Sequence, residues 1–163
     1  FAYGRGQHWE AWEDTVQLNY GHKGLRSAMH AILHKIAGLA DGVRCDVAMM
    51  VEQDLLKSTW GPLLQPSDGT EEVTEEFWPG AIQGVKKEHP DFIFMAESYW
   101  DREKALQDKG FDFCYDKVLY DSLAQGDGEG VVKTLTQDKA YQSKLARFIE
   151  NHDEERAATV WSE

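Results

Sequence analysis

Three acidic residues follow apolar runs at widely separated points of this sequence. Asp46 closes the run VRCD, Glu97 closes FIFMAE, and Asp153 comes shortly after the run in FIENHDEER. Short apolar runs bounded by polar residues are typical of buried strands. Because the carboxyl ends of parallel strands lie at one edge of a sheet, these three acids would meet there if the strands share a sheet. Converging carboxylates repel one another and lose hydration, so an arrangement of this kind indicates a functional site.

Glycoside hydrolysis is a reaction that uses paired carboxylates. One carboxylate attacks the anomeric carbon, a second protonates the leaving oxygen, and nearby polar groups stabilise an oxocarbenium-like transition state. In the double-displacement form of the reaction the two carboxyl groups lie about 5–5.5 Å apart. We expect a separation of this order between the carboxyl groups of Asp46 and Glu97.

Each acid also has a simpler structural explanation. Asp46 could pair with Arg44, which lies two residues earlier and therefore on the same face of a strand. Glu97 could be a solvated strand end, and either Asn151 or Asp153 could cap the N-terminus of a following helix. The spacing of the acids alone therefore predicts only an α/β protein with an acidic site.

The pattern of apolar residues predicts the elements that position these acids. A helix is expected over residues 22–40, where apolar residues recur at steps of three or four and form one face: Leu25, Met29, Ile32, Ile36 and Leu39. Strands alternate with helices along the rest of the chain, which predicts βαβ units and a parallel sheet. The expected strands are 43–50, 92–97, 111–116 and 146–150, and the further helices are 79–89, 101–109 and 137–146.

A chain of 163 residues fits one domain. Residues 1–21 are expected to form a loop segment before the first helix, and residues 51–78 an acidic loop insertion. Gly126, Gly128 and Gly130 indicate a flexible loop, since glycine permits many backbone conformations. Cys45 and Cys114 both fall inside expected strands, where a small buried thiol is more common than a disulfide.

The formal charge of −12 argues against nucleic acid and anionic membranes as partners. Neutral ligands fit better, and an acidic chain rich in aromatic residues suits sugars. No apolar run is long enough to span a membrane, and nothing in the sequence indicates a cellular location.

The sequence gives no reason to expect a metal or another cofactor. His30 and His34 lie one helical turn apart, a spacing that metals use, but no third ligand stands nearby and an exposed helix face is the better explanation. The GDGEG segment has too few ligand oxygens at calcium spacing for an EF-hand.

Three of these segments resemble conserved stretches of the α-amylase superfamily (glycoside hydrolase family 13). DGVRCDVAM is similar to the second stretch of the family, FMAESYW to the third and FIENHDEER to the fourth, in the order of the family. WEDTVQLNYG also resembles the segment that precedes the second stretch. The resemblance covers nearly all of residues 1–163 and implies a partial catalytic domain: about half of a (β/α)8 TIM-barrel, with its fourth to seventh strands.

The resemblance also implies a role for each acid. Asp46 would be the nucleophile, Glu97 the general acid and base, and Asp153 the residue that binds sugar hydroxyls and stabilises the transition state. Arg44 would keep Asp46 ionised and oriented, and His152 would donate a hydrogen bond to the sugar. These roles belong to a retaining mechanism.

Three further residues are expected to bind substrate. Asn151 lies within the fourth stretch, and Tyr99 and Trp100 could offer a flat face to a sugar ring, although an aromatic pair after a strand is also a common packing feature. The second stretch of the family often ends in a Lys-His pair, whereas this sequence has Met50–Val51. The choice between hydrolase and transglycosidase therefore stays open.

The expected substrate is an α-glucan or oligosaccharide. The alternative from another functional class is a catalytically silent half-barrel that binds carbohydrate or self-associates. The first conserved stretch of the family would lie before Phe1, so we expect the isolated chain to be inactive. We also expect a homodimer of half-barrels, because open sheet edges pair readily with another chain. A flavodoxin-like binding module is disfavoured, since no glycine-rich phosphate loop follows any strand.

Overall fold

The computed structural model describes residues 3–5, 10–61 and 74–162. The chain forms two compact units. The first unit comprises residues 1–41 and 50–92, and the second, called the sheet unit below, comprises residues 42–49 and 93–163.

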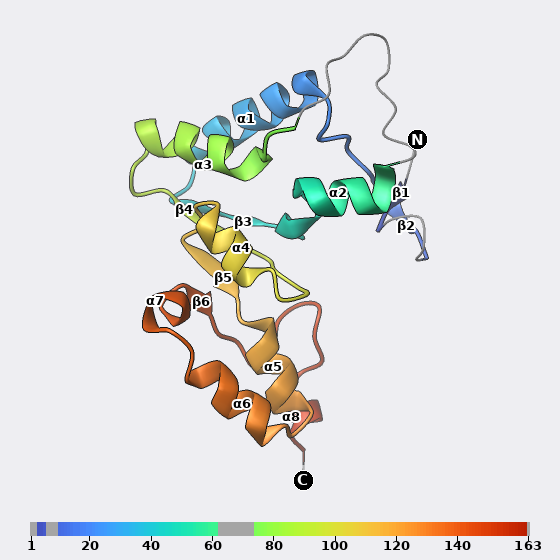
Figure 1. Ribbon diagram of the computed structural model, residues 1–163, viewed down its shortest axis with the longest axis vertical. Coiled ribbons are helices and arrows are strands. Elements are labelled where there is room, and N and C mark those ends of the chain that lie inside the picture. The colour runs from blue at the N-terminus through green and yellow to red at the C-terminus, as the bar shows by residue number, and fades with distance from the viewer. Residues whose placement is uncertain (1–2, 6–9, 62–73, 163) are drawn as a thin grey trace. The chain divides into compact units, whose positions relative to one another are not determined.

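Two packed helices form the centre of the first unit. Helices α1 (Lys23–Ala37) and α3 (Phe77–Glu88) lie side by side (Figure 1). The buried ring of Phe77 contacts Tyr20 at 4.9 Å and Trp78 at 5.1 Å between ring centroids. Helix α2 (Gln53–Trp60) follows the 3-10 helix η1 (Ala48–Val51), which crosses from the sheet unit into this one.

Several expectations for the first unit need correction. The segment 1–21 is not all loop, because β1 (Tyr3–Gly4) and β2 (Trp12–Val16) form an antiparallel pair. All five residues of β2 are exposed, so the alternation that reveals a half-buried strand is missing from the sequence. The segment 51–78 is not all loop either, because it contains α2 and the first two residues of α3. Helix α2 buries Leu56 and Trp60 on one face. Residues 62–73 of that predicted insertion lie outside the described residues.

The predicted apolar face of α1 is correct in part. Leu33 and Ala37 are the buried residues of the helix, whereas Ile32 is exposed. Leu39 is exposed as well, since α1 ends at Ala37 with Gly38 as its C-cap. Periodicity located the helix but placed the centre of its buried face one residue too early.

The sheet unit has the predicted α/β architecture. Its four strands are all parallel and lie in chain order: β3 (Gly42–Cys45), β4 (Ile93–Ala96), β5 (Phe113–Tyr115) and β6 (Leu145–Ala146). Its helices are α4 (Glu103–Asp108), α5 (Lys117–Ala124), α6 (Gly128–Leu135), α7 (Lys139–Gln142) and α8 (Ala157–Val160). Helices α5 and α6 pack against each other (Figure 1).

Apolar side chains of the strands and of α4 form the core of the sheet unit. The rings of Phe94 and Phe111 meet edge to face at 6.3 Å, and Leu106 is fully buried. Cys45 and Cys114 are buried free thiols, as predicted. These contacts hold the carboxyl ends of the strands in place.

The glycine-rich segment of the sheet unit is not a loop. Gly126 adopts a positive φ of 69° after α5, but α6 begins at Gly128. The Asp127 side chain caps this helix by accepting the Gly130 N–H at 3.0 Å. The capping interaction therefore outweighs the low helix propensity of the glycines.

The strands are shorter than the sequence predicts. The expected strand 43–50 ends at Cys45 and turns into η1, and the expected strand 146–150 ends at Ala146. Ile149 is exposed, so this apolar residue is not part of a buried strand. The expected helix 137–146 is reduced to α7, and the short helices α5 and α8 were not predicted.

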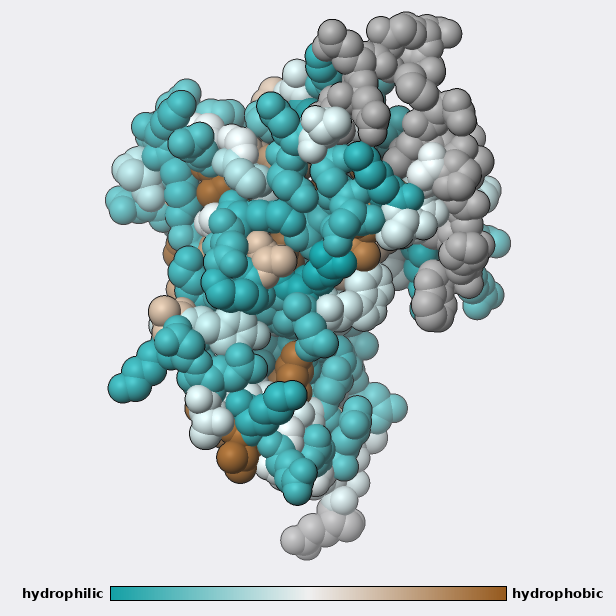
Figure 2. Space-filling model, viewed as in Figure 1, coloured by the Kyte–Doolittle hydropathy of each residue, from teal (hydrophilic) through white to brown (hydrophobic). Residues whose placement is uncertain are grey.

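The face of the molecule drawn in Figure 2 is mostly hydrophilic. Hydrophobic residues are scattered over it. None of the helices in the described part of the chain is long and apolar enough to cross a membrane.

Candidate functional site

The register of the sheet places Asp46 and Glu97 next to each other. Cys45 pairs with Ala96 as the last residue of each strand, so Asp46 and Glu97 both occupy the next position. The Glu97 N–H donates to the Cys45 carbonyl at 3.0 Å, which extends the pairing to this level. Equivalent positions on parallel neighbours direct side chains to the same face of a sheet. Both acids therefore lie at the carboxyl edge of the sheet unit, as predicted.

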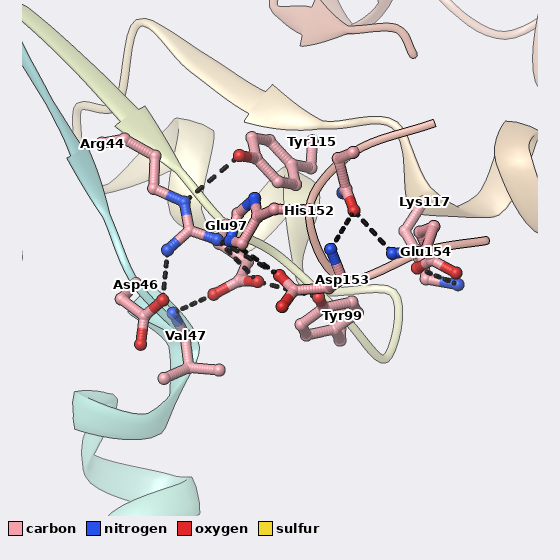
Figure 3. A network of polar contacts seen from close by, with 11 residues as sticks. Arg44, Asp46, Val47, Glu97, Tyr99, Tyr115, Lys117, His152, Asp153 and Glu154 are labelled. Carbon is pink, nitrogen blue, oxygen red and sulfur yellow. Dashed lines mark hydrogen bonds and ion pairs between the residues drawn. The ribbon is translucent and has the colours of Figure 1, made fainter. Parts of the chain in front are cut away.

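Arg44 connects the three predicted acids (Figure 3). Its Nη1 forms an ion pair with Asp46, and its Nη2 lies 2.8 Å from Glu97 Oε1 and 3.9 Å from Asp153 Oδ2. Its Nε donates to the Tyr115 hydroxyl at 3.2 Å. The simple ion pair between Arg44 and Asp46 is thus present, and it is one part of a convergence of all three carboxyl groups on one cation.

The surroundings of Arg44 raise the pKa of its guanidinium and so favour the charged form. Burial lowers the pKa of the guanidinium, but hydrogen bonds to Tyr115 and Asp46 and the negative charge of Glu97 outweigh it. The net pKa is raised above its ordinary value, so the side chain is a permanent cation in the centre of the site.

The two acids at the strand ends differ sharply in exposure. The Glu97 side chain is 4% exposed, whereas the Asp46 side chain is 75% exposed. Glu97 Oε1 accepts a hydrogen bond from the Tyr99 hydroxyl at 2.8 Å, and Oε2 accepts the Val47 N–H at 2.5 Å. Asp46 is therefore open to a ligand, while Glu97 is enclosed, held by two hydrogen-bond donors and paired with the Arg44 cation.

Val47 shows that the chain is constrained at this point. Its φ of 36° lies in the left-handed region, which is unfavourable for a β-branched residue. The strained conformation directs the Val47 N–H at Glu97 immediately after Asp46. Backbone strain of this kind persists only where surrounding contacts hold it, and it often occurs at functional sites.

The aromatic pair after β4 is split between two environments. Burial, the hydrogen bond to Glu97 and the charges of Glu97, Asp153 and Glu154 raise the pKa of Tyr99. Trp100 is 63% exposed and therefore lies on the surface instead of in the core. Its backbone has a positive φ of 59°. Tyr99 is thus tied to the acids, and Trp100 is accessible.

Asp153 reaches the site from a loop instead of a strand end. Asn151 Oδ1 accepts the N–H groups of Asp153 and Glu154 at 2.8 and 2.9 Å, which forms a local turn. It does not cap a helix, because α8 has Arg156 as its N-cap. His152 is largely exposed, and its Nε2 lies 3.0 Å from Asp153 Oδ2. Asn151 therefore shapes the loop that presents these two residues.

The sequence analysis missed Lys117 and Tyr115. Lys117 Nζ lies 3.1 Å from Glu154 Oε1 and also pairs with Asp121, which ties α5 to the loop that carries Asp153. Tyr115 is the last residue of β5. The strand-end argument, applied to FDFCYD as it was to the other runs, points to Asp116, which instead caps α5. Only the pairing of Cys114 with Ala96 shows that Tyr115 lies at the level of Glu97.

The geometry offers no metal centre within the described ranges. No group of three or more His, Cys, Asp or Glu residues there is arranged to hold a metal ion. His30 and His34 lie on α1 in the first unit, where the His30 ring contacts Phe77 at 5.2 Å and His34 lies 3.6 Å from Glu88. Burial lowers the pKa of His30, and the charges of Arg26 and His34 lower it further.

The site therefore combines an exposed carboxylate, an enclosed carboxyl group, a third acid and an imidazole around one arginine. Carboxylates and imidazoles can bind the hydroxyl groups of a polyol. An exposed carboxylate beside a second carboxyl group can also serve nucleophilic and acid–base chemistry.

Comparison with known proteins identifies the fold. No protein-family model matches the chain, and no curated protein matches it. An α-amylase from Lactobacillus plantarum is similar in structure with a TM-score of 0.63 and 23% sequence identity, over 98% of this chain and 38% of the other. A debranching enzyme from Nostoc punctiforme has a TM-score of 0.62 and 15% identity, over 94% of this chain and 35% of the other.

A third solved structure, an α-amylase from H. orenii, has a TM-score of 0.61 and 17% identity, over 92% of this chain and 31% of the other. The chain thus spans between 31% and 38% of these three structures. At such identities the similarity establishes the fold.

Proposed function

We propose that this chain is part of a retaining α-glycoside hydrolase or transglycosidase that acts on α-glucans. The observation that carries the proposal is the convergence of Asp46, Glu97 and Asp153 on Arg44 at the carboxyl edge of a parallel sheet. The similarity in fold to two α-amylases and a debranching enzyme supports it. In this proposal the four strands are the fourth to seventh of a (β/α)8 barrel.

Asp46 is the proposed nucleophile because it is the exposed acid. Its carboxylate attacks the anomeric carbon, the bond from that carbon to the leaving oxygen breaks, and a glycosyl ester forms. Arg44 orients the carboxylate through Nη1. Water or a sugar hydroxyl then attacks the same carbon and releases Asp46, which completes hydrolysis or transfer.

Glu97 is the proposed general acid and base. It gives a proton to the leaving oxygen in the first step and takes one from the attacking hydroxyl in the second. Both oxygens accept hydrogen bonds, one from the Tyr99 hydroxyl and one from the Val47 N–H. Acid catalysis therefore requires one of these contacts to open when a ligand binds. Asp153 and His152, on the exposed loop, are placed to bind sugar hydroxyls.

A trapping experiment tests this proposal. Although the isolated chain is expected not to turn over α-glucans, a fluorinated glucosyl fluoride with the α configuration has a leaving group that does not need a general acid, so it should still react. The carbon–fluorine bond at the anomeric carbon breaks, fluoride leaves and an ester forms on Asp46. Peptide mass spectrometry locates the ester. The Asp46→Asn variant should give no adduct, and Asp41→Asn, which changes an exposed acid in the same stretch, should react like the unchanged protein.

The second candidate function is carbohydrate binding without turnover. The enclosure of Glu97 by two hydrogen-bond donors and the Arg44 cation favours it, because the proposed acid is not free to reach a ligand. Saturable binding of maltotriose, without an adduct and without release of reducing sugar, would support this alternative and contradict the catalytic proposal. An adduct on Asp46 would exclude it.

A further inference from the structure

Tyr115 lies at the same level of the sheet as the two acids. Ala96 of β4 pairs with Cys114 of β5, so the next positions bring Glu97 and Tyr115 side by side. Asp46 occupies the corresponding position one strand further along. Asp46, Glu97 and Tyr115 thus occupy corresponding positions on three neighbouring strands of the sheet, and the tyrosine has no role in the chemistry proposed above.

The tyrosine contacts Arg44 in two ways. Its hydroxyl accepts the Nε–H of Arg44 at 3.2 Å, and the guanidinium carbon lies 5.4 Å from the centroid of its ring (Figure 3). The Nε hydrogen bond fixes the plane of the guanidinium, because Nε is the atom nearest to the side-chain stem. Nη1 and Nη2 are then free to face the acids.

Packing on the other side holds Tyr115 independently of Arg44. Its ring lies 5.3 Å from the ring of Phe148, and Phe148 stacks on Tyr120 at 5.2 Å with an interplanar angle of 20°. Tyr120 belongs to α5 and is buried. The aromatic row therefore connects the rigid part of the sheet unit to the guanidinium.

The acids themselves are poorly suited to fix the arginine. The side chains of Asp46 and Asp153 are 75% and 48% exposed, and ion pairs of exposed groups are weak and easily rearranged. Only Glu97 among them is enclosed, and it contacts one end of the guanidinium. A second fixed contact is needed to determine the orientation of a planar group.

We propose that Tyr115 is a positioning residue that holds Arg44 in the one orientation in which it faces Asp46, Glu97 and Asp153 together. The catalytic consequence of this arrangement rests on the proposed function, whereas the arrangement itself does not. Loss of the Tyr115 hydroxyl should release the guanidinium and change the surroundings of all three acids at once.

The test compares Tyr115→Phe with the unchanged chain by NMR spectroscopy. The first signal is the hydrogen exchange of the Arg44 Nε–H, which we expect to become about tenfold faster, as for the loss of one hydrogen bond. The second is the set of carboxyl carbon resonances of Asp46, Glu97 and Asp153, which we expect to move together. Tyr115→Leu, which also removes the ring, should enlarge both effects.

Tyr141→Phe is the matched control, since it removes a hydroxyl from another half-buried tyrosine of the sheet unit. It should leave the Arg44 and carboxyl signals unchanged. Backbone amide spectra show whether each variant is folded, and Tyr115→Phe decides the question if Tyr115→Leu unfolds. Unchanged Nε–H exchange in folded Tyr115→Phe, or a shift in only one of the three acids, would overturn the proposal.

These signals do not depend on turnover. A chain that forms no glycosyl adduct but shows the expected changes supports the positioning role and contradicts the catalytic function. If the unchanged chain does form the adduct, Tyr115→Phe should form it about tenfold more slowly. Adduct formation at the unchanged rate, with unchanged Arg44 signals, would retain the proposed function and exclude the positioning role.

Discussion

Replacement of Arg44 by leucine should destabilise the sheet unit far more than the loss of a surface charge. Glu97 is 4% exposed and would lose a cation at 2.8 Å. Removing one partner of a buried ion pair costs about 3–5 kcal/mol, but the Tyr99 hydroxyl and the Val47 N–H still donate to Glu97. The contact with exposed Asp46 adds only about 0–1 kcal/mol. We therefore expect the free energy of unfolding to fall by about 3 kcal/mol, the low end of the buried range.

The sign of the pH dependence follows from the raised pKa of Arg44. A cation whose pKa is higher in the folded state stabilises below its unfolded pKa and loses that contribution as the pH rises through the folded pKa. Both transitions lie far above neutrality. The difference between the variant and the unchanged protein should therefore not vary around neutral pH through titration of Arg44 itself.

Urea unfolding followed by far-UV circular dichroism measures this effect. Arg156→Leu is the matched control, because Arg156 is 78% exposed and pairs with Glu150 at 2.9 Å. That substitution should cost less than about 1 kcal/mol, as for an exposed pair. Equal losses for Arg44→Leu and Arg156→Leu would refute the reasoning, since they would show that the enclosed carboxyl group does not need its cation.

Three further predictions concern other parts of the sheet unit. Gly130→Ala should lower the free energy of urea unfolding by about 1 kcal/mol through loss of the α6 cap, because the new Cβ would clash with the capping Asp127 carboxylate, whose Cγ lies 3.0 Å away. Gly128→Ala meets no atom within 4 Å and should not be destabilising. Burial raises the pKa of Glu103, so the contribution of this side chain to stability declines as the pH rises through that pKa. Glu103→Gln should therefore increase the free energy of urea unfolding more at about pH 7 than at about pH 4. Burial raises the pKa of the Cys45 thiol to about 12, against the opposing charge of Arg44, so a thiol reagent at about pH 8 should modify it rapidly only in urea. Equal stability of the two glycine variants, a pH-independent effect of Glu103→Gln, or rapid modification of native Cys45 would each contradict the corresponding argument.

The sequence determined the local features of this protein well. Runs of apolar residues located the strands around Cys45, Phe94 and Cys114, because each strand buries apolar side chains on at least one face of the sheet. Alternation of strands with helices predicted the parallel sheet, and the strand ends at Asp46 and Glu97 predicted that these two acids would meet.

Two other local signals were misleading, one because a strand needs a partner from elsewhere in the chain and one because a nearby capping residue was overlooked. FIE looks like a strand, but Ile149 is exposed and β6 ends at Ala146. Three glycines suggested a loop, yet a single aspartate cap at Asp127 starts a helix there. An apolar run shows that burial is favourable, but not whether a neighbouring strand is present to pair with it.

Only the tertiary structure decided how the acids differ from one another. Asp46 and Glu97 occupy equivalent positions after their strands, and these positions alone do not distinguish an open carboxylate from an enclosed one. The difference arises because Val47 and Tyr99 direct their donors at Glu97 and leave Asp46 exposed. The role of Tyr115 likewise depends on its register with the neighbouring strand, since it reaches Arg44 across 71 positions of the sequence. Composition and periodicity indicate which side chains are stabilised by burial. Register and exposure depend on partners that are distant in the chain.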